Sequence, residues 1–159
     1  MITRTLRGFT ALLLALFITA CSADIGPDEE LLYGTWQQDG PTEAGDDLRV
    51  DKAVITYAPD GTSDFTAVMT VTANEGIPER FTIDADVSWT LEETILIRTL
   101  NGVSVTPDIS TPEADALAAA LAEEYRRSPP GRLIIESVDA AQLVLLDAAN
   151  GQTLTYNKQ

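Results

Sequence analysis

Residues 81–91 alternate apolar and polar side chains without a break, and this pattern constrains the fold more than any other feature of the chain. The segment reads Phe-Thr-Ile-Asp-Ala-Asp-Val-Ser-Trp-Thr-Leu, and every odd-numbered position is apolar. Successive side chains of a β-strand point to opposite faces of a sheet. A period of two over eleven residues therefore predicts a strand with one buried face and one solvated face.

Further segments extend this predicted sheet. The other predicted strands are 49–58, 64–72, 94–100, 132–138, 142–147 and 152–156. Short turn sequences separate the strands, and the dipeptides Asn101-Gly102 and Asn150-Gly151 are typical of type I′ hairpins. Eight or nine short strands in up-and-down order indicate an all-β fold, and we expect an antiparallel up-and-down β-barrel.

One amphipathic helix is predicted within this series, over about residues 111–127. Thr111 is a suitable N-cap, Pro112 suits the first helical position, and Pro129-Pro130-Gly131 ends the helix. One helical face is apolar, and it consists of Ala114, Leu117, Ala118, Leu121 and Tyr125. This face either packs on the barrel, which its small alanines favour, or serves as a lid or as a docking face for a partner.

Charge and composition exclude several classes of function. The chain has 10 basic and 25 acidic residues, a formal net charge of −15, and no His. A surface of this charge repels nucleic acid, so we expect no nucleic-acid binding. Catalytic triads, Cys–His dyads and zinc sites that need imidazole are absent. We therefore expect that the protein is not an enzyme and that it holds no cofactor and no metal.

The N-terminal residues have the organisation of an export signal. Arg4 and Arg7 precede an apolar run over 9–18 that is too short for a membrane span. The run ends in Ile18-Thr19-Ala20-Cys21, which resembles the lipobox of bacterial lipoproteins. The resemblance implies that residues 1–20 are cleaved as a signal peptide and that Cys21 carries a diacylglycerol and a further acyl chain such as palmitate.

The resemblance also implies where the mature protein lies. Acyl chains on Cys21 would hold it at a membrane. Residue 22 is Ser rather than Asp, which resembles the outer-membrane address of bacterial lipoproteins, with the domain facing the periplasm. We expect residues 21–30 to form a short lipidated tether and residues 31–159 to form one barrel domain. Cleavage would leave eight basic against 25 acidic residues, a net charge of −17. We expect a monomer.

A series of short motifs in the predicted barrel indicates a family resemblance. Gly34-Thr35-Trp36 opens the first strand, Asp60-Gly61 marks a hairpin, Trp89 ends a strand, and Lys158 lies near the C-terminus. Their order resembles the small lipocalin-like domains of bacterial lipoproteins. The resemblance implies that Gly34, Trp36 and Lys158 close one end of an eight-stranded barrel. The interior of such a barrel is either filled or holds one small ligand.

The alternation also predicts candidate sites. The expected ligand-lining side chains are Phe65, Met69, Phe81, Ile83, Val87, Trp89, Ile95 and Ile97. Trp36 and Trp89 can instead be ordinary core residues. The acidic residues between 39 and 51 can form either a Ca²⁺ loop or a solvated loop. Asp84 and Asp86 share a predicted solvated face, which makes a catalytic role for them weak.

Two hypotheses about function follow. The first is a non-enzymatic, lipid-anchored envelope protein that binds a small apolar ligand in its barrel. The alternative is a structural or interaction module with a filled core that assists or inhibits another envelope protein. The interior volume discriminates between them, because an open apolar cavity of several hundred Å³ favours a ligand and a filled interior favours the interaction module.

Overall fold

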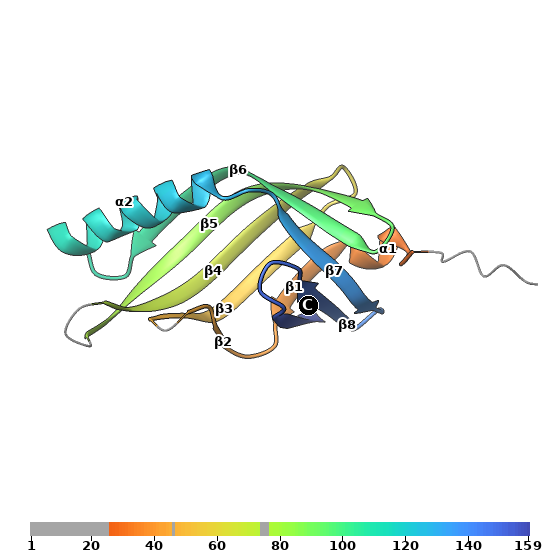
Figure 1. Ribbon diagram of the computed structural model, residues 1–159, viewed down its shortest axis with the longest axis horizontal. Helices are drawn as coiled ribbons and strands as arrows, with labels where there is room; N and C mark the ends of the chain where they lie inside the picture. The colour runs from red at the N-terminus through yellow and green to blue at the C-terminus, as the bar shows by residue number, and fades with distance from the viewer. Residues whose placement is uncertain (1–25, 46, 74–76) are drawn as a thin grey trace, which may run out of the picture.

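The structure is a computed structural model that describes residues 26–45, 47–73 and 77–159 (Figure 1). The lipidation candidate Cys21 and the predicted signal peptide lie outside these ranges. The elements are α1 (Glu29–Leu32), β1 (Gly34–Gln38), β2 (Thr42–Glu43), β3 (Leu48–Tyr57), β4 (Thr62–Ala73), β5 (Ile77–Glu92), β6 (Ile95–Pro107), α2 (Pro112–Arg127), β7 (Gly131–Val138), β8 (Gln142–Asp147) and β9 (Thr153–Lys158).

The strands close into a barrel. They form one antiparallel sheet in the order β1-β9-β8-β7-β6-β5-β4-β3-β2. Strand β1 pairs with β9 on one side and with β3 on the other, which joins the two ends of the sheet. Eight strands make up the barrel, and the two-residue β2 is an addition to β3. The predicted up-and-down barrel with one inserted helix is confirmed.

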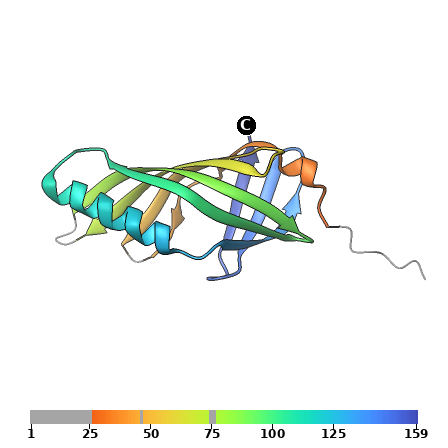
Figure 2. The ribbon, with the colours of Figure 1, turned by 90° about the horizontal axis from the view of Figure 1, so that it is seen from above.

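The barrel walls differ in length. Strands β4, β5 and β6 have 12, 16 and 13 residues and are longer than the short strands predicted, whereas β7, β8 and β9 have only six to eight. Strand β6 pairs with β7 only between Ile95 and Arg98. Beyond Arg98, helix α2 lies along β6 in the place of a further strand (Figure 2).

The interior is divided into two hydrophobic clusters. The first, at the end enclosed by β7, β8 and β9, contains Leu32, Trp36, Ile55, Tyr57, Trp89, Leu96, Leu133, Ile135, Leu143, Leu145 and Tyr156. The second, beneath α2, contains Ala53, Ala67, Met69, Phe81, Ile83 and Ala118. Phe65 packs against both clusters. The long strands thus carry apolar side chains past the enclosed end, and α2 covers them there.

Helix α2 packs on this second cluster through its small residues. The Thr111 hydroxyl accepts a hydrogen bond from the Ala114 N–H at 3.1 Å, which caps the helix as the sequence predicts. Ala114, Ala118 and Ala122 are buried, while Leu117, Leu121 and Tyr125 are half-buried around them. The row of alanines lets the helix axis approach the sheet closely.

A β-bulge in β6 replaces the hairpin turn predicted at Asn101-Gly102. Gly102 lies opposite Asp86 and Leu100 opposite Val87, so Asn101 is an extra residue without a direct partner. The inward positions of β6 are therefore even-numbered before the bulge and odd-numbered after it. By contrast, Asn150-Gly151 lies in the connection of the β8–β9 hairpin, where Gly151 has a φ of 73°.

The segment before the barrel also differs from expectation. Residues 29 and 30 belong to the short helix α1 rather than to an irregular tether. The Asp28 carboxylate caps this helix by accepting from the Glu30 N–H at 3.1 Å. Leu32 at its end is fully buried in the first cluster. Within residues 26–45, 47–73 and 77–159, neither helix has the length and apolar character of a membrane span.

Candidate functional site

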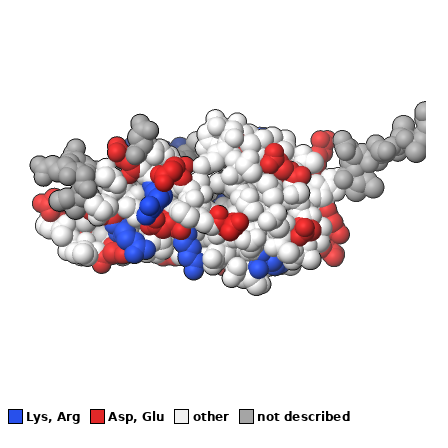
Figure 3. All heavy atoms as spheres, turned by 90° about the horizontal axis from the view of Figure 1, so that it is seen from below, with Lys and Arg blue, Asp and Glu red and all other residues white. Residues whose placement is uncertain are grey.

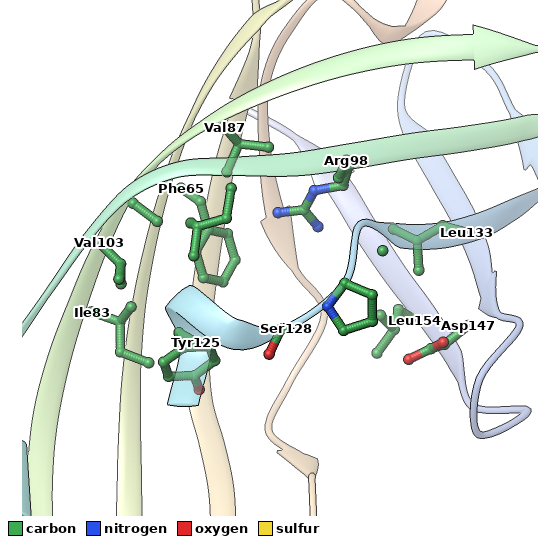
Figure 4. A pocket seen from close by; sticks show the side chains of 14 residues that line it. Phe65, Ile83, Val87, Arg98, Val103, Tyr125, Ser128, Leu133, Asp147 and Leu154 are labelled. Atoms are coloured by element: carbon green, nitrogen blue, oxygen red, sulfur yellow. The ribbon is translucent and has the colours of Figure 1, made fainter. Parts of the chain in front are cut away.

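An open cavity of about 300 Å³ lies between the two clusters (Figure 4). Three barrel strands, β4, β5 and β6, form one wall, and the end of α2 with strand β7 forms the other. The lining consists of Phe65, Ile83, Ala85, Val87, Arg98, Leu100, Val103, Tyr125, Ser128, Pro129, Gly131, Leu133, Asp147 and Leu154. Most of these side chains are apolar, and the lining includes Arg98 and Gly131, the last residue pair between β6 and β7.

The predicted lining residues divide among three environments. Phe65, Ile83 and Val87 line the cavity. Met69 and Phe81 are fully buried beneath α2 in the second cluster. Trp89 belongs to the first cluster, where its indole N–H donates to the Ala58 and Thr62 carbonyls at 3.2 and 3.0 Å. Met69, Phe81 and Trp89 therefore do not line the cavity, as the sequence predicted they would, but pack in the clusters on either side of it.

The inward placement predicted for Ile95 and Ile97 is wrong. Ile95 lies opposite Glu92 and Ile97 opposite Thr90, both exposed, so these isoleucines are on the outer face. Leu96, which is fully buried, takes the inner position. The segment 94–100 has apolar side chains on both faces. The bulge at Asn101 also changes which positions face inward, from even-numbered residues before it to odd-numbered residues after it. Alternation alone could not place it.

Arg98 is a lining residue that sequence reasoning missed. It lies opposite Trp89 and next along the inner face from Leu96. Its guanidinium carbon is 5.3 Å from the centre of the Phe65 ring, a cation–π geometry that Figure 4 shows from close by. The signal in the sequence is an arginine among the isoleucines and leucines of residues 95–100.

Tyr57 places a second polar group in the interior without a partner. Its side chain is 1% exposed, and its hydroxyl has no hydrogen-bond partner in the described part of the chain. Burial raises the pKa of Tyr57 to about 12, and the positive charge of Arg98 opposes this rise. Burial likewise raises the pKa of Tyr156, again against the charge of Arg98. The inner surface near Arg98 is thus apolar, with a few isolated polar atoms.

The raised pKa of Tyr57 predicts a stability loss at high pH. Its pKa is about 12 in the folded state and about 10 in the unfolded state, so the unfolded state ionises first. Burial of the neutral Tyr57 hydroxyl therefore costs no extra stability below pH 10. As the pH rises from 10 toward 12, the free energy of unfolding should fall by about 2–3 kcal/mol. Tyr57→Phe should match or exceed wild-type stability at pH 8 and should lack this part of the loss. Urea unfolding from pH 8 to 12 tests this, and parallel curves would contradict it.

Gly34, Trp36 and Lys158 meet at the enclosed end of the barrel. The Lys158 Nζ lies 4.1 Å from the centre of the Trp36 ring and donates to the Leu31 and Tyr33 carbonyls. The Trp36 indole N–H donates to the Leu32 carbonyl at 2.7 Å. Gly34 has a φ of +108°, and a Cβ there would lie 3.1 Å from the Lys158 Cε. The positive φ therefore favours glycine at this position.

The acidic residues that the structure describes, which exclude Asp46 of the predicted acidic loop, do not gather into one site. Figure 3 shows acidic side chains scattered over one face of the domain. Asp51 accepts from the Thr70 hydroxyl and pairs with Arg49, and these contacts lower its pKa against the opposing effect of burial. The Asp84 carboxylate accepts from Thr66 on the exposed outer face. No three of the described His, Cys, Asp and Glu side chains are grouped as metal ligands.

The chain resembles a protein of known structure. A lipocalin-like protein from Bacteroides uniformis, known from a crystal structure, resembles this chain with a TM-score of 0.44 and 18% sequence identity. The likeness covers 81% of this chain and 99% of that chain. No family model matches the sequence, and no curated protein matches it. The assignment of the barrel therefore depends on the strand order, and a likeness of this degree carries no conclusion about a ligand.

Proposed function

We propose that the protein is a lipid-anchored, non-enzymatic lipoprotein of the cell envelope that binds a small apolar ligand in the cavity beside α2. The observation that carries the proposal is the cavity itself. Its volume of about 300 Å³ and its largely apolar lining fall within the range of small-molecule sites. Its lining includes Arg98 and Gly131, the last residue pair between β6 and β7.

The attachment and location are proposed from the sequence. The lipobox-like Ile18-Thr19-Ala20-Cys21 supports acyl chains on Cys21, and Ser22 supports an outer-membrane location facing the periplasm. We further propose a monomer that holds no metal or cofactor. The acidic surface opposes binding to anionic lipid headgroups, so the acyl chains would be the means of attachment.

Native mass spectrometry of the full chain tests the ligand. The protein is released from non-ionic detergent, and dodecan-1-ol is added as an apolar probe. Wild type should retain the probe or a co-purified lipid. Val103→Phe should abolish retention because the new ring occupies the cavity, whose wall includes Val103. Ser104→Phe is the matched control, since Ser104 is exposed on the outer face of the same strand.

The outcomes separate the two hypotheses about function. Retention by wild type and by Ser104→Phe, with loss in Val103→Phe, supports a ligand in this cavity. Retention that survives Val103→Phe contradicts the proposed location. If wild type retains neither probe nor lipid, the ligand-binding function is wrong and the interaction module takes its place.

A further inference from the structure

Arg98 is the basic side chain among those that line the cavity, and its charge is not neutralised within the described part of the chain. Its pairing with Trp89 puts it on the inner face of β6. The Nε atom is buried and forms no hydrogen bond with any described residue. No described carboxylate forms an ion pair with the guanidinium within 4.0 Å.

Arg98 is half-buried, and a cation that loses part of its hydration is stabilised by a nearby group that offsets its charge. The Phe65 ring at 5.3 Å compensates for part of the cost. The one acidic residue of the lining is Asp147, whose carboxylate instead accepts from the Ala149 N–H at 2.8 Å. Tyr125, the other titratable lining residue, donates to the Met69 sulfur. The lining therefore leaves the charge of Arg98 without a counter-charge. Such a side chain can bind an anion that comes from outside the chain.

The surroundings of Arg98 leave room for such an anion. Arg98 faces Gly131 in the last residue pair between β6 and β7, where the two strands separate. Gly131 has no side chain, and it lines the cavity together with Arg98. Beyond the Phe65 ring, the cavity wall continues through apolar side chains, including Ile83 and Val103, toward the end of α2 (Figure 4). The cavity thus has a cation in one part and an apolar channel in the other.

We propose that the cavity binds a single-chain amphiphile that carries a carboxylate, with the carboxylate on Arg98 and the chain against β5, β6 and the end of α2. The inference rests on the proposed ligand-binding function and names the class of ligand. A guanidinium presents parallel N–H donors that match an anionic oxygen pair. A volume of about 300 Å³ lies at the lower limit for ligand sites and favours one chain over a two-chain lipid.

Three probes with the same chain test the proposal by native mass spectrometry of the full protein. They are dodecanoate, dodecan-1-ol and dodecyl phosphate, each added at equal concentration. Wild type should retain dodecanoate at least tenfold more strongly than dodecan-1-ol. Arg98→Met should lose the preference for dodecanoate, so that it retains dodecanoate no more strongly than dodecan-1-ol. Arg98→Lys should keep part of the preference, because it keeps the charge but not the paired donors.

The outcomes distinguish this inference from the function on which it rests. Equal retention of dodecanoate and dodecan-1-ol by wild type, or an unchanged preference in Arg98→Met, overturns the anion site and leaves the ligand-binding function standing. Failure of wild type to retain any probe overturns both. Stronger retention of dodecyl phosphate than of dodecanoate overturns the carboxylate and indicates a phosphate group. Circular dichroism checks folding, and if Arg98→Met does not fold, Arg98→Gln provides the same comparison.

Discussion

Replacement of Trp36 by alanine is expected to lower the free energy of unfolding by about 3–5 kcal/mol. The indole is fully buried at the enclosed end of the barrel. Its removal leaves a cavity, deprives the Leu32 carbonyl of its 2.7 Å hydrogen bond, and removes the ring beneath the Lys158 ammonium. Urea unfolding followed by circular dichroism measures the effect without depending on tryptophan fluorescence.

Trp36→Phe is the matched variant for this measurement. It keeps an aromatic ring beneath Lys158 but lacks the indole N–H, so its loss should be about 1–3 kcal/mol. The difference between the two variants then reports the packing of the ring. A loss of less than 1 kcal/mol for Trp36→Ala would mean that Trp36 does not hold this end of the barrel together.

Replacement of Cys21 by alanine is expected to abolish attachment to the membrane. The acyl chains would have no thiol to receive them, and signal cleavage that depends on lipid transfer would stop, so the uncleaved precursor should accumulate. Metabolic labelling with a radioactive fatty acid and the mobility of the protein in gels measure both effects. Ser22→Ala is the control, because it should leave labelling and cleavage at Cys21 intact.

The structure adds a geometric reason to expect a close approach to the membrane. Gly26 lies against the backbone of Glu93 in the β5–β6 turn. A side chain at residue 26 would collide with the Glu93 carbonyl, so the domain begins at this contact. Four residues, 22–25, separate the candidate anchor Cys21 from Gly26 in the sequence, and the five steps from residue 21 to residue 26 can span at most about 17 Å. Labelling and cleavage that persist in Cys21→Ala would contradict the lipoprotein assignment.

Strand positions were predictable where the alternation is strict. In residues 81–91, Phe81, Ile83, Ala85, Val87 and Trp89 are all buried, as the period of two requires. The cap and start of α2 were equally local, because Thr111 and Pro112 act within one helical turn. The segment 94–100 was not predictable in this way, since its isoleucines and leucines suit either face and only pairing with β5 selects one.

The cavity was less accessible to sequence reasoning than the barrel. Three of the eight predicted lining residues are in its wall, namely Phe65, Ile83 and Val87. Met69, Phe81 and Trp89 are inside the barrel but are buried in the two clusters, whose boundary depends on where α2 replaces a strand. Ile95 and Ile97 were misplaced because only the pairing with β5 shows that they lie on the outer face. Arg98 was missed because a charged residue in a strand is expected to face water.

The sequence by itself determined the features that depend on neighbouring residues: an all-β chain, the alternating faces of its clearest strands, the helix at 112–127, and the lipobox-like segment that ends at Cys21. The tertiary structure alone decided the closure of β1 on β3 and β9, the bulge at Asn101, and the inward side of Arg98. The physical reason is the distance along the chain over which each interaction acts. Local patterns select a conformation within a few residues, whereas register, closure and the boundary between two clusters are set by pairing between segments that are distant in sequence.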